Sequence, residues 1–195
     1  MFYKIAKDDF QFIIPTFLIL IFFFFTDILH IFNKLDLAYF SGLFHREPYR
    51  IFTTHFTHAD FGHLLSNIGG IIFIRYFLKE LQLKSNKFYI IFMIFASTLL
   101  ILLQWISDIY LFTNPFSILI GFSGIVYASF AFIVMSSIYG KDRFLSFYIG
   151  LVPNIKVKQA SLVILGIGFL WSLLPGISLS GHFYGFLAGI ILFFL

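Results

Sequence analysis

The feature that most constrains the fold of this chain is a set of long stretches without a charged residue. Residues 11–26, 88–107, 109–140 and 159–181 contain no Asp, Glu, Lys or Arg. A helix needs about 20 mainly apolar residues to cross a bilayer, so these stretches have the character of membrane spans. Charged residues make up only 11% of the chain, against about 25% in soluble domains. The sequence therefore predicts an all-α membrane protein.

The limits of the apolar stretches predict a bundle of six transmembrane helices that forms a single domain over residues 1–195. The first apolar run has no small-residue cleavage site after it, so we interpret it as a retained span and not as a signal peptide. Residues 29–62 are rich in aromatic side chains but also carry charges, and we expect them to form a folded, partly embedded first loop. The six spans are placed at residues 10–28, 63–79, 88–107, 117–139, 158–174 and 178–195.

Most of the 13 basic residues fall on one predicted side of the membrane. The opposite side carries Lys34, Arg46 and Arg50. Because basic residues concentrate in cytoplasmic loops, the N-terminus is predicted to be cytoplasmic and the first loop to face outward. The net charge of +4 follows from this topology and does not indicate nucleic-acid binding. The residues on the basic side are Lys4, Lys7, Arg75, Lys79, Lys84, Lys87, Lys141, Arg143, Lys156 and Lys158.

Three polar residues on different predicted helices are expected at one depth in the membrane. A helix rises about 1.5 Å per residue. Counting from the cytoplasmic helix ends places His63, Ser123 and His182 about 4–10 Å below the outer surface. Asn67 is four residues after His63 and shares its helix face. We interpret this shared layer as the candidate site.

Ser123 is the candidate nucleophile of this layer. It lies in Gly121-Phe122-Ser123-Gly124, at the start of the fourth predicted span. Serine often only packs a helix interface in membranes. Here, however, Gly121 and Gly124 leave room for a substrate carbonyl, and a helix N-terminus offers unpaired N–H groups to an oxyanion.

His182 is the candidate general base. An ionisable residue within a span is unfavourable and is a functional hypothesis by default, although it can also bond a backbone carbonyl. Gly181, Gly185 and Gly189 form a small-residue ridge that allows close helix packing, which is expected to bring His182 to Ser123. Histidine can then take the serine proton and return it to the leaving group. No carboxylate lies in the outer layer of these two spans, which favours a dyad over a triad.

The remaining candidates would support the dyad. The Asn67 side-chain amide is a potential donor to an oxyanion, with His63 as a second donor; alternatively, Asn67 only bonds another helix. His58 lies at the end of the first loop and is expected to organise it. Tyr127, one turn into the fourth span, either packs against the His182 ring or is an ordinary core aromatic residue.

Other classes of function are less consistent with this sequence. His55, His58 and His63 are clustered, but the zinc signature H-E-x-x-H is absent and there is no cysteine. We therefore expect neither a metal nor another cofactor. A small transporter or channel would need polar residues along a complete path, whereas here they stop at one layer. A non-catalytic protein that binds or escorts transmembrane helices is the main alternative.

Taken together, three motifs resemble those of the rhomboid intramembrane serine proteases in their compact bacterial six-span form. They are His63-x3-Asn67, Gly121-x-Ser123-Gly124, and His182 followed by the Gly185-x3-Gly189 pair. The resemblance covers roughly residues 49–189. The high Phe, Ile and Lys content is consistent with an AT-rich bacterial genome, so we expect a bacterial inner-membrane protein.

The resemblance implies roles for the individual residues. Ser123 would be the nucleophile and His182 the general base, and the Ser123 N–H would join His63 and Asn67 in an oxyanion hole. Tyr127 would stack beside the histidine, and positions in the first loop would be structural, among them Arg50 and His58. The implied substrates are transmembrane segments of other membrane proteins, cleaved without metal or nucleotide. The sequence departs from the family at Tyr49, Thr54 and Lys79-Glu80, which concerns loop rigidity more than the dyad.

Overall fold

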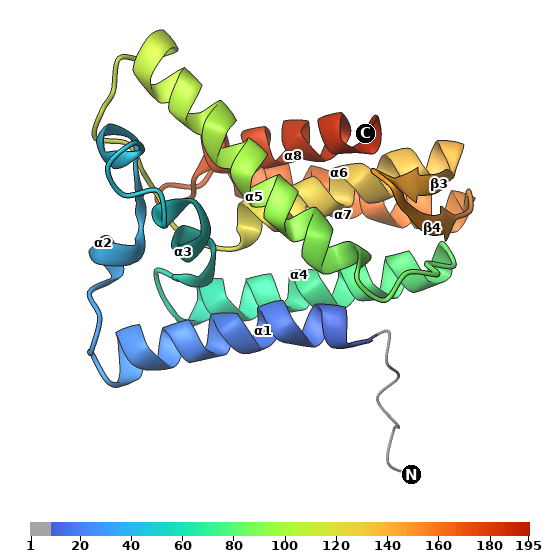
Figure 1. The fold of residues 1–195 in the computed structure, drawn as a ribbon, viewed down its shortest axis with the longest axis horizontal. Coiled ribbons are helices and arrows are strands. Elements are labelled where there is room, and N and C mark those ends of the chain that lie inside the picture. The colour runs from blue at the N-terminus through green and yellow to red at the C-terminus, as the bar shows by residue number, and fades with distance from the viewer. Residues whose placement is uncertain (1–8) are drawn as a thin grey trace.

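The computed structural model describes residues 9–195, so the expected basic residues Lys4 and Lys7 lie outside the described part. The described chain is mostly helical, with two small two-stranded sheets (Figure 1). The helices are α1 (Phe10–Phe23), α2 (Lys34–Leu37), α3 (Arg50–Phe56), α4 (Phe61–Glu80), α5 (Phe88–Ile106), α6 (Ser123–Tyr139), α7 (Ile155–Trp171) and α8 (Leu179–Phe193). The strands are β1 (Tyr39–Phe40), β2 (Ile118–Leu119), β3 (Lys141–Phe144) and β4 (Phe147–Leu151).

Helix α6 lies at the centre of the bundle and packs against α4, α5, α7 and α8. Figure 1 shows α4, α6 and α8 running toward the β3–β4 hairpin and α1 and α7 running away from it. The first residues of α4, α6 and α8 therefore lie at the same end of the bundle, beside α2 and α3. This shared direction places the first turns of three helices next to one another.

Three helices in the described part of the chain are long and apolar enough to cross a membrane. They are α1 with its π-helical continuation (Phe10–Ile28), α4, and α5 with its π-helical continuation (Phe88–Leu111). Helices α6 and α8 are apolar but shorter. The predicted helical membrane protein is thus present, while the count of six spans stays a prediction.

Several predicted helix limits are displaced by capping residues. Asp60 accepts a hydrogen bond from the His63 N–H at 2.8 Å and starts α4 at Phe61. Asn154 accepts from the backbone of Lys156 and starts α7 at Ile155, earlier than expected. Such side-chain acceptors satisfy the free N–H groups of a first helical turn. The prediction from apolar runs did not take these caps into account.

The segment 117–122 was wrongly predicted to be helical. Its strand β2 pairs antiparallel with β1 of the first loop. The Gly121 N–H donates to the Thr54 carbonyl at 2.9 Å, and Gly121 has a φ of +112°. That backbone conformation is available to glycine and cannot belong to a right-handed helix. Helix α6 consequently begins at Ser123 and not six residues earlier.

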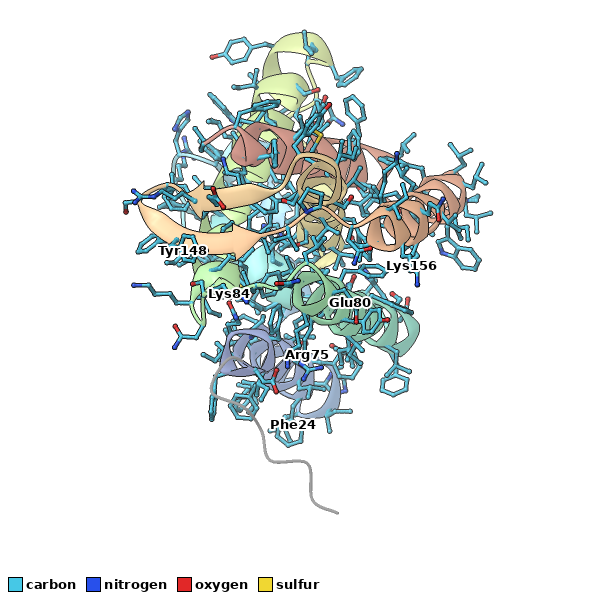
Figure 2. All side chains as sticks on the ribbon, turned by 90° about the vertical axis from the view of Figure 1, so that its right-hand side faces the viewer. Phe24, Arg75, Glu80, Lys84, Tyr148 and Lys156 are labelled. Carbon is cyan, nitrogen blue, oxygen red and sulfur yellow. The ribbon has the colours of Figure 1, made fainter. Side chains whose placement is uncertain are left out.

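The connection 141–151 was not predicted to contain strands, yet β3 and β4 form a hairpin. Phe144 and Ile149 anchor it because both are fully buried, and the Lys84 N–H donates to the Ile149 carbonyl. Figure 2 looks onto this end of the molecule, where Arg75, Lys84 and Lys156 are labelled. The hairpin end is therefore also the basic end among the described residues.

The first loop is folded, as expected. Arg50 organises it by donating from one guanidinium nitrogen to the carbonyls of Leu35 and Ala38, both at 2.6 Å. The same guanidinium contacts Glu47, and this hydrogen bond holds the pKa of the Glu47 carboxyl below its usual range. Thr54 donates its hydroxyl to the Leu119 carbonyl and so ties the loop to β2. Thr54, one of the positions that depart from the family pattern, thus still connects the loop to β2.

Candidate active site

Ser123 and His182 lie within hydrogen-bond distance of each other. Ser123 is the first residue of α6, and its Oγ is 2.8 Å from Nε2 of His182. His182 lies in the first turn of α8, which begins after the N-cap residue Ser178. The Ser178 hydroxyl accepts from the Gly181 N–H at 3.1 Å and thereby orients this turn. Two residues separated by 59 positions are thus held in contact by two helix N-termini.

The glycines of α8 explain how the two helices approach so closely. A Cβ atom at Gly185 would overlap the backbone of Gly124, and one at Gly189 would overlap the backbone of Ala128. The two helices therefore meet backbone to backbone, as small-residue ridges allow in membranes. Gly124 also leaves room for the Leu100 side chain of α5.

Two side chains fix the orientation of the His182 ring. Tyr127 stacks on it with ring centroids 4.2 Å apart and an interplanar angle of 10°. Ser172, at the end of α7, places its Oγ 2.6 Å from Nδ1 of His182. The sequence left the stacking of Tyr127 open, the family resemblance implied it, and Ser172 was not identified. Its only sequence signal is a lone polar residue within the apolar run Leu170–Leu174.

His63 of α4 lies against Gly121, two residues before the candidate nucleophile. A Cβ atom at Gly121 would come within 2.5 Å of Nε2 of His63, so only glycine leaves this space for the imidazole. Next to it, the rings of His58 and His63 are 5.1 Å apart. The predicted first-turn residues of α4 and α6 are therefore brought together.

Asn67 lies on the side of α4 that faces α6. Gly70, three residues later and on the same face, packs against Val126 of α6. Helices α4 and α6 run in the same direction (Figure 1), and Asn67 and Ser123 each lie three residues before the contact of Gly70 with Val126. The Asn67 side chain is buried, and its Nδ2 has no hydrogen-bond partner in the described part of the chain. A buried amide donor without a partner is unfavourable unless it serves a ligand.

Two histidines of the first loop, His55 and His58, are buried and uncharged at neutral pH. Burial is the main cause that lowers the pKa of His58 to about 4, and the neighbouring His63 adds to it. Burial also lowers the pKa of His55 to about 4. Nδ1 of His58 is 3.2 Å from the Phe56 carbonyl, which holds the end of the loop. Residues 9–195 contain no group of three or more His, Cys, Asp or Glu side chains that could hold a metal ion.

The site thus brings a serine and a histidine together at the N-termini of two apolar helices. The Rhomboid domain family matches residues 45–195. The chain therefore belongs to the rhomboid family, which confirms the resemblance seen in the sequence. It is an integral membrane protein of a family that acts on membrane-protein substrates and whose members are usually serine proteases. No curated protein matches the chain.

Proposed function

We propose that this protein is an intramembrane serine endopeptidase that hydrolyses peptide bonds in or near transmembrane segments of other membrane proteins. The observation that carries the proposal is the 2.8 Å contact between Ser123 Oγ and His182 Nε2. A serine hydroxyl is a weak nucleophile until a neighbouring base removes its proton. Membership of the rhomboid family also supports this activity, since rhomboid proteins are usually serine proteases.

The reaction would proceed in two half-reactions. Ser123 Oγ attacks the peptide carbonyl carbon while Nε2 of His182 takes the hydroxyl proton, and the carbonyl oxygen becomes an oxyanion. The oxyanion then collapses, the C–N bond breaks, and His182 gives the proton to the leaving amine. In the second half, water attacks the acyl-enzyme ester, His182 takes its proton, and that proton returns to Ser123 Oγ as the ester C–O bond breaks.

Three donors are available to the oxyanion. Ser123 is the first residue of α6, so its backbone N–H has no partner within the helix. The free Asn67 amide and the His63 ring approach from α4. Donors held in place before the reaction stabilise developing charge most effectively. We assign all three to the oxyanion hole, with Gly121 providing the space.

The topology follows from the distribution of charge and from helix length. Helices α6 and α8 have 17 and 15 residues, or about 25 and 22 Å at 1.5 Å per residue. Helices this short would start inside the membrane, so that water could reach Ser123 from above their first turns. The basic hairpin end would be cytoplasmic, so that the site opens to the outer side. The proposed protein is thus a single six-span domain in the bacterial inner membrane, with a cytoplasmic N-terminus.

The connection between α7 and α8 would act as a mobile cap over the dyad. It contains Pro175 and Gly176, whose φ is +83°. Leu173 and Leu174 within it are exposed. Displacement of this short segment would open the space above His182 to a substrate helix.

The test is cleavage of a model transmembrane substrate by the purified protein reconstituted in liposomes. Ser123→Ala should abolish cleavage, and His182→Ala should lower kcat by about 10²–10⁴-fold because the general base is lost. Ser129→Ala is the matched control, since Ser129 is a buried serine of the same helix whose hydroxyl donates to the Ile125 carbonyl at 2.7 Å. Cleavage by Ser123→Ala at the parental rate would refute the proposal. Absence of cleavage by the parent would instead favour a non-catalytic binder of transmembrane helices.

A further inference from the structure

Ser172 is the one polar side chain in the described structure that contacts Nδ1 of the candidate base. It lies at the C-terminus of α7 and is only 2% exposed. Its Oγ is 2.6 Å from His182 Nδ1, 3.1 Å from the Tyr127 hydroxyl and 2.8 Å from the Gly168 carbonyl oxygen. Three helices, α6, α7 and α8, therefore meet at this one hydroxyl.

The hydrogen atoms at this junction can be assigned by counting donors and acceptors. A serine hydroxyl has one proton to donate and two lone pairs. The Gly168 carbonyl can only accept, so a Ser172 proton given to it leaves the Ser172 oxygen as an acceptor. The oxygen then receives the proton of His182 Nδ1 and that of the Tyr127 hydroxyl. All three polar groups are satisfied.

This assignment decides which nitrogen of His182 faces Ser123 as an acceptor. A neutral imidazole carries one proton, so Nδ1–H leaves Nε2 with a free lone pair. The reverse assignment, with Ser172 donating to Nδ1, would put the proton on Nε2 and prevent it from accepting the Ser123 proton. Ser129 and Ser161 both donate to a carbonyl four residues earlier, as Ser172 does in the first assignment. The first assignment is therefore the one that agrees with the other buried helical serines of this protein.

We propose that Ser172 is the positioning residue of His182: it accepts the Nδ1 proton and so holds the imidazole in the tautomer whose Nε2 can activate Ser123. The role rests on the proposed protease function and deepens it. Ser172 touches neither the substrate nor the reacting atoms, and it acts only through the histidine. It occupies the place that a carboxylate takes in a catalytic triad, but as a neutral acceptor suited to a dry membrane interior.

The Tyr127 hydroxyl belongs to the same arrangement. Gly168 is the residue that makes room for it, because a Cβ there would lie 2.5 Å from the Tyr127 oxygen. Gly168→Ala should therefore displace Tyr127 and disturb the junction without removing any polar atom. Gly166→Ala is its matched control on the same helix, since a Cβ at Gly166 meets nothing within 4 Å.

The direct test is ¹⁵N NMR of the full chain labelled at histidine, with His182 assigned through His182→Gln. At about pH 8, where free imidazole is neutral, the parent should show a protonated Nδ1 and an unprotonated Nε2. Ser172→Ala should shift this signal toward a mixture of the two tautomers. A protonated Nε2 in the parent would overturn the inference, whether or not the protein cleaves any substrate.

Kinetics supply the second test. Ser172→Ala should lower kcat by about 2- to 12-fold, as expected for the loss of one hydrogen bond, and leave KM unchanged. Ser172→Thr, which keeps the hydroxyl, should restore the rate, and Ser161→Ala is the control for a buried serine of the same helix. Parental kcat in Ser172→Ala would overturn the inference, as would an equal loss in Ser161→Ala.

The failure of this inference is distinguishable from that of the proposed function. Ser123→Ala, measured in the same liposomes, tests the protease function alone. If a thermal unfolding measurement shows that Ser172→Ala is not folded, the Gly168→Ala and Gly166→Ala pair replaces it in the kinetic comparison. A loss of kcat confined to Gly168→Ala would support the junction, and equal rates in the pair would count against it.

Discussion

Two helix pairs in this protein are held together in opposite ways. Helices α6 and α8 touch backbone to backbone, with Gly185 on Gly124 and Gly189 on Ala128. Helices α1 and α4 instead leave an apolar groove of about 270 Å³ between them. At one end of that groove, Asp9 forms ion pairs with Arg75 at 2.9 Å and with Lys79 at 2.5 Å.

The difference shows where precision is needed. The α6–α8 pair carries Ser123 and His182, and a shift of one side chain would break their 2.8 Å contact. In the α1–α4 pair, α1 carries no candidate site residue. Helix α1 also lies outside the residues that match the Rhomboid domain. Close backbone packing thus occurs where the chemistry is placed, and looser packing with ion pairs occurs at the periphery. The following substitutions test this contrast.

The largest effect is expected from Gly185→Val. Its side chain would collide with the Gly124 backbone, which cannot move aside, so α6 and α8 must separate. Overpacking of this kind lowers the free energy of unfolding by about 1–3 kcal/mol. We expect cleavage to fall below detection, because the contact between Ser123 and His182 is broken as well. Rates and thermal unfolding midpoints measured in the same detergent would show both effects.

The control for Gly185→Val is Gly69→Ala on α4. A Cβ at Gly69 meets nothing within 4 Å, so this substitution should leave cleavage unchanged and, through helix propensity, slightly raise stability. If Gly185→Val cleaved as well as Gly69→Ala, close packing of α6 on α8 would not be a requirement of the site.

A smaller effect is expected from Asn67→Ala in the N-terminal half of α4. Loss of one oxyanion donor should lower kcat by about 10²–10³-fold with little change in KM. Ser66→Ala is the neighbouring control, because Ser66 is exposed and its hydroxyl donates to the His63 carbonyl at 2.9 Å. If Asn67→Ala lowered the unfolding midpoint but left kcat intact, Asn67 would be a structural residue between helices. In that case α4, like α1, would contribute to the stability of the fold and not to catalysis.

The smallest effect is expected at the α1–α4 ion pairs and depends on pH. The hydrogen bond from Arg75, assisted by Lys79, lowers the pKa of Asp9 from 3.8 to about 2. Because the folded-state pKa is the lower one, the ion pairs stabilise the fold above about pH 4 and this contribution is lost as pH falls toward about 2. The unfolding midpoint of the parent should therefore exceed that of Asp9→Asn at pH values near neutrality, and the two should converge on acidification. A difference that does not shrink as the pH falls toward about 2 would show that Asp9 acts through something other than its charge.

The sequence could predict the parts of the site that short patterns encode. Ser123 among glycines, the glycine ridge after His182 and the four-residue spacing of His63 and Asn67 are all local. Each also depends on a helix whose apolar run is evident in the sequence. The depth count then placed them in one layer, and the structure brings their helix ends together.

The parts that could not be predicted depend on contacts between distant segments. The extended form of residues 117–122 exists because β2 pairs with β1, some 80 positions earlier in the chain. Ser172 could not be identified because its role depends on the rotation of α7 and on the approach of Tyr127 from α6. The β3–β4 hairpin was read as a charged connection, since its buried residues Phe144 and Ile149 contact partners outside it.

The most direct test of the central claim is covalent labelling of Ser123. The reconstituted protein would be treated with a fluorophosphonate, digested, and mapped by mass spectrometry, with His182→Ala treated in parallel. If Ser123 is a nucleophile activated by His182, the adduct should lie on Ser123, form rapidly in the parent and form far more slowly in His182→Ala. No adduct on Ser123, or equal labelling with and without His182, would contradict the account.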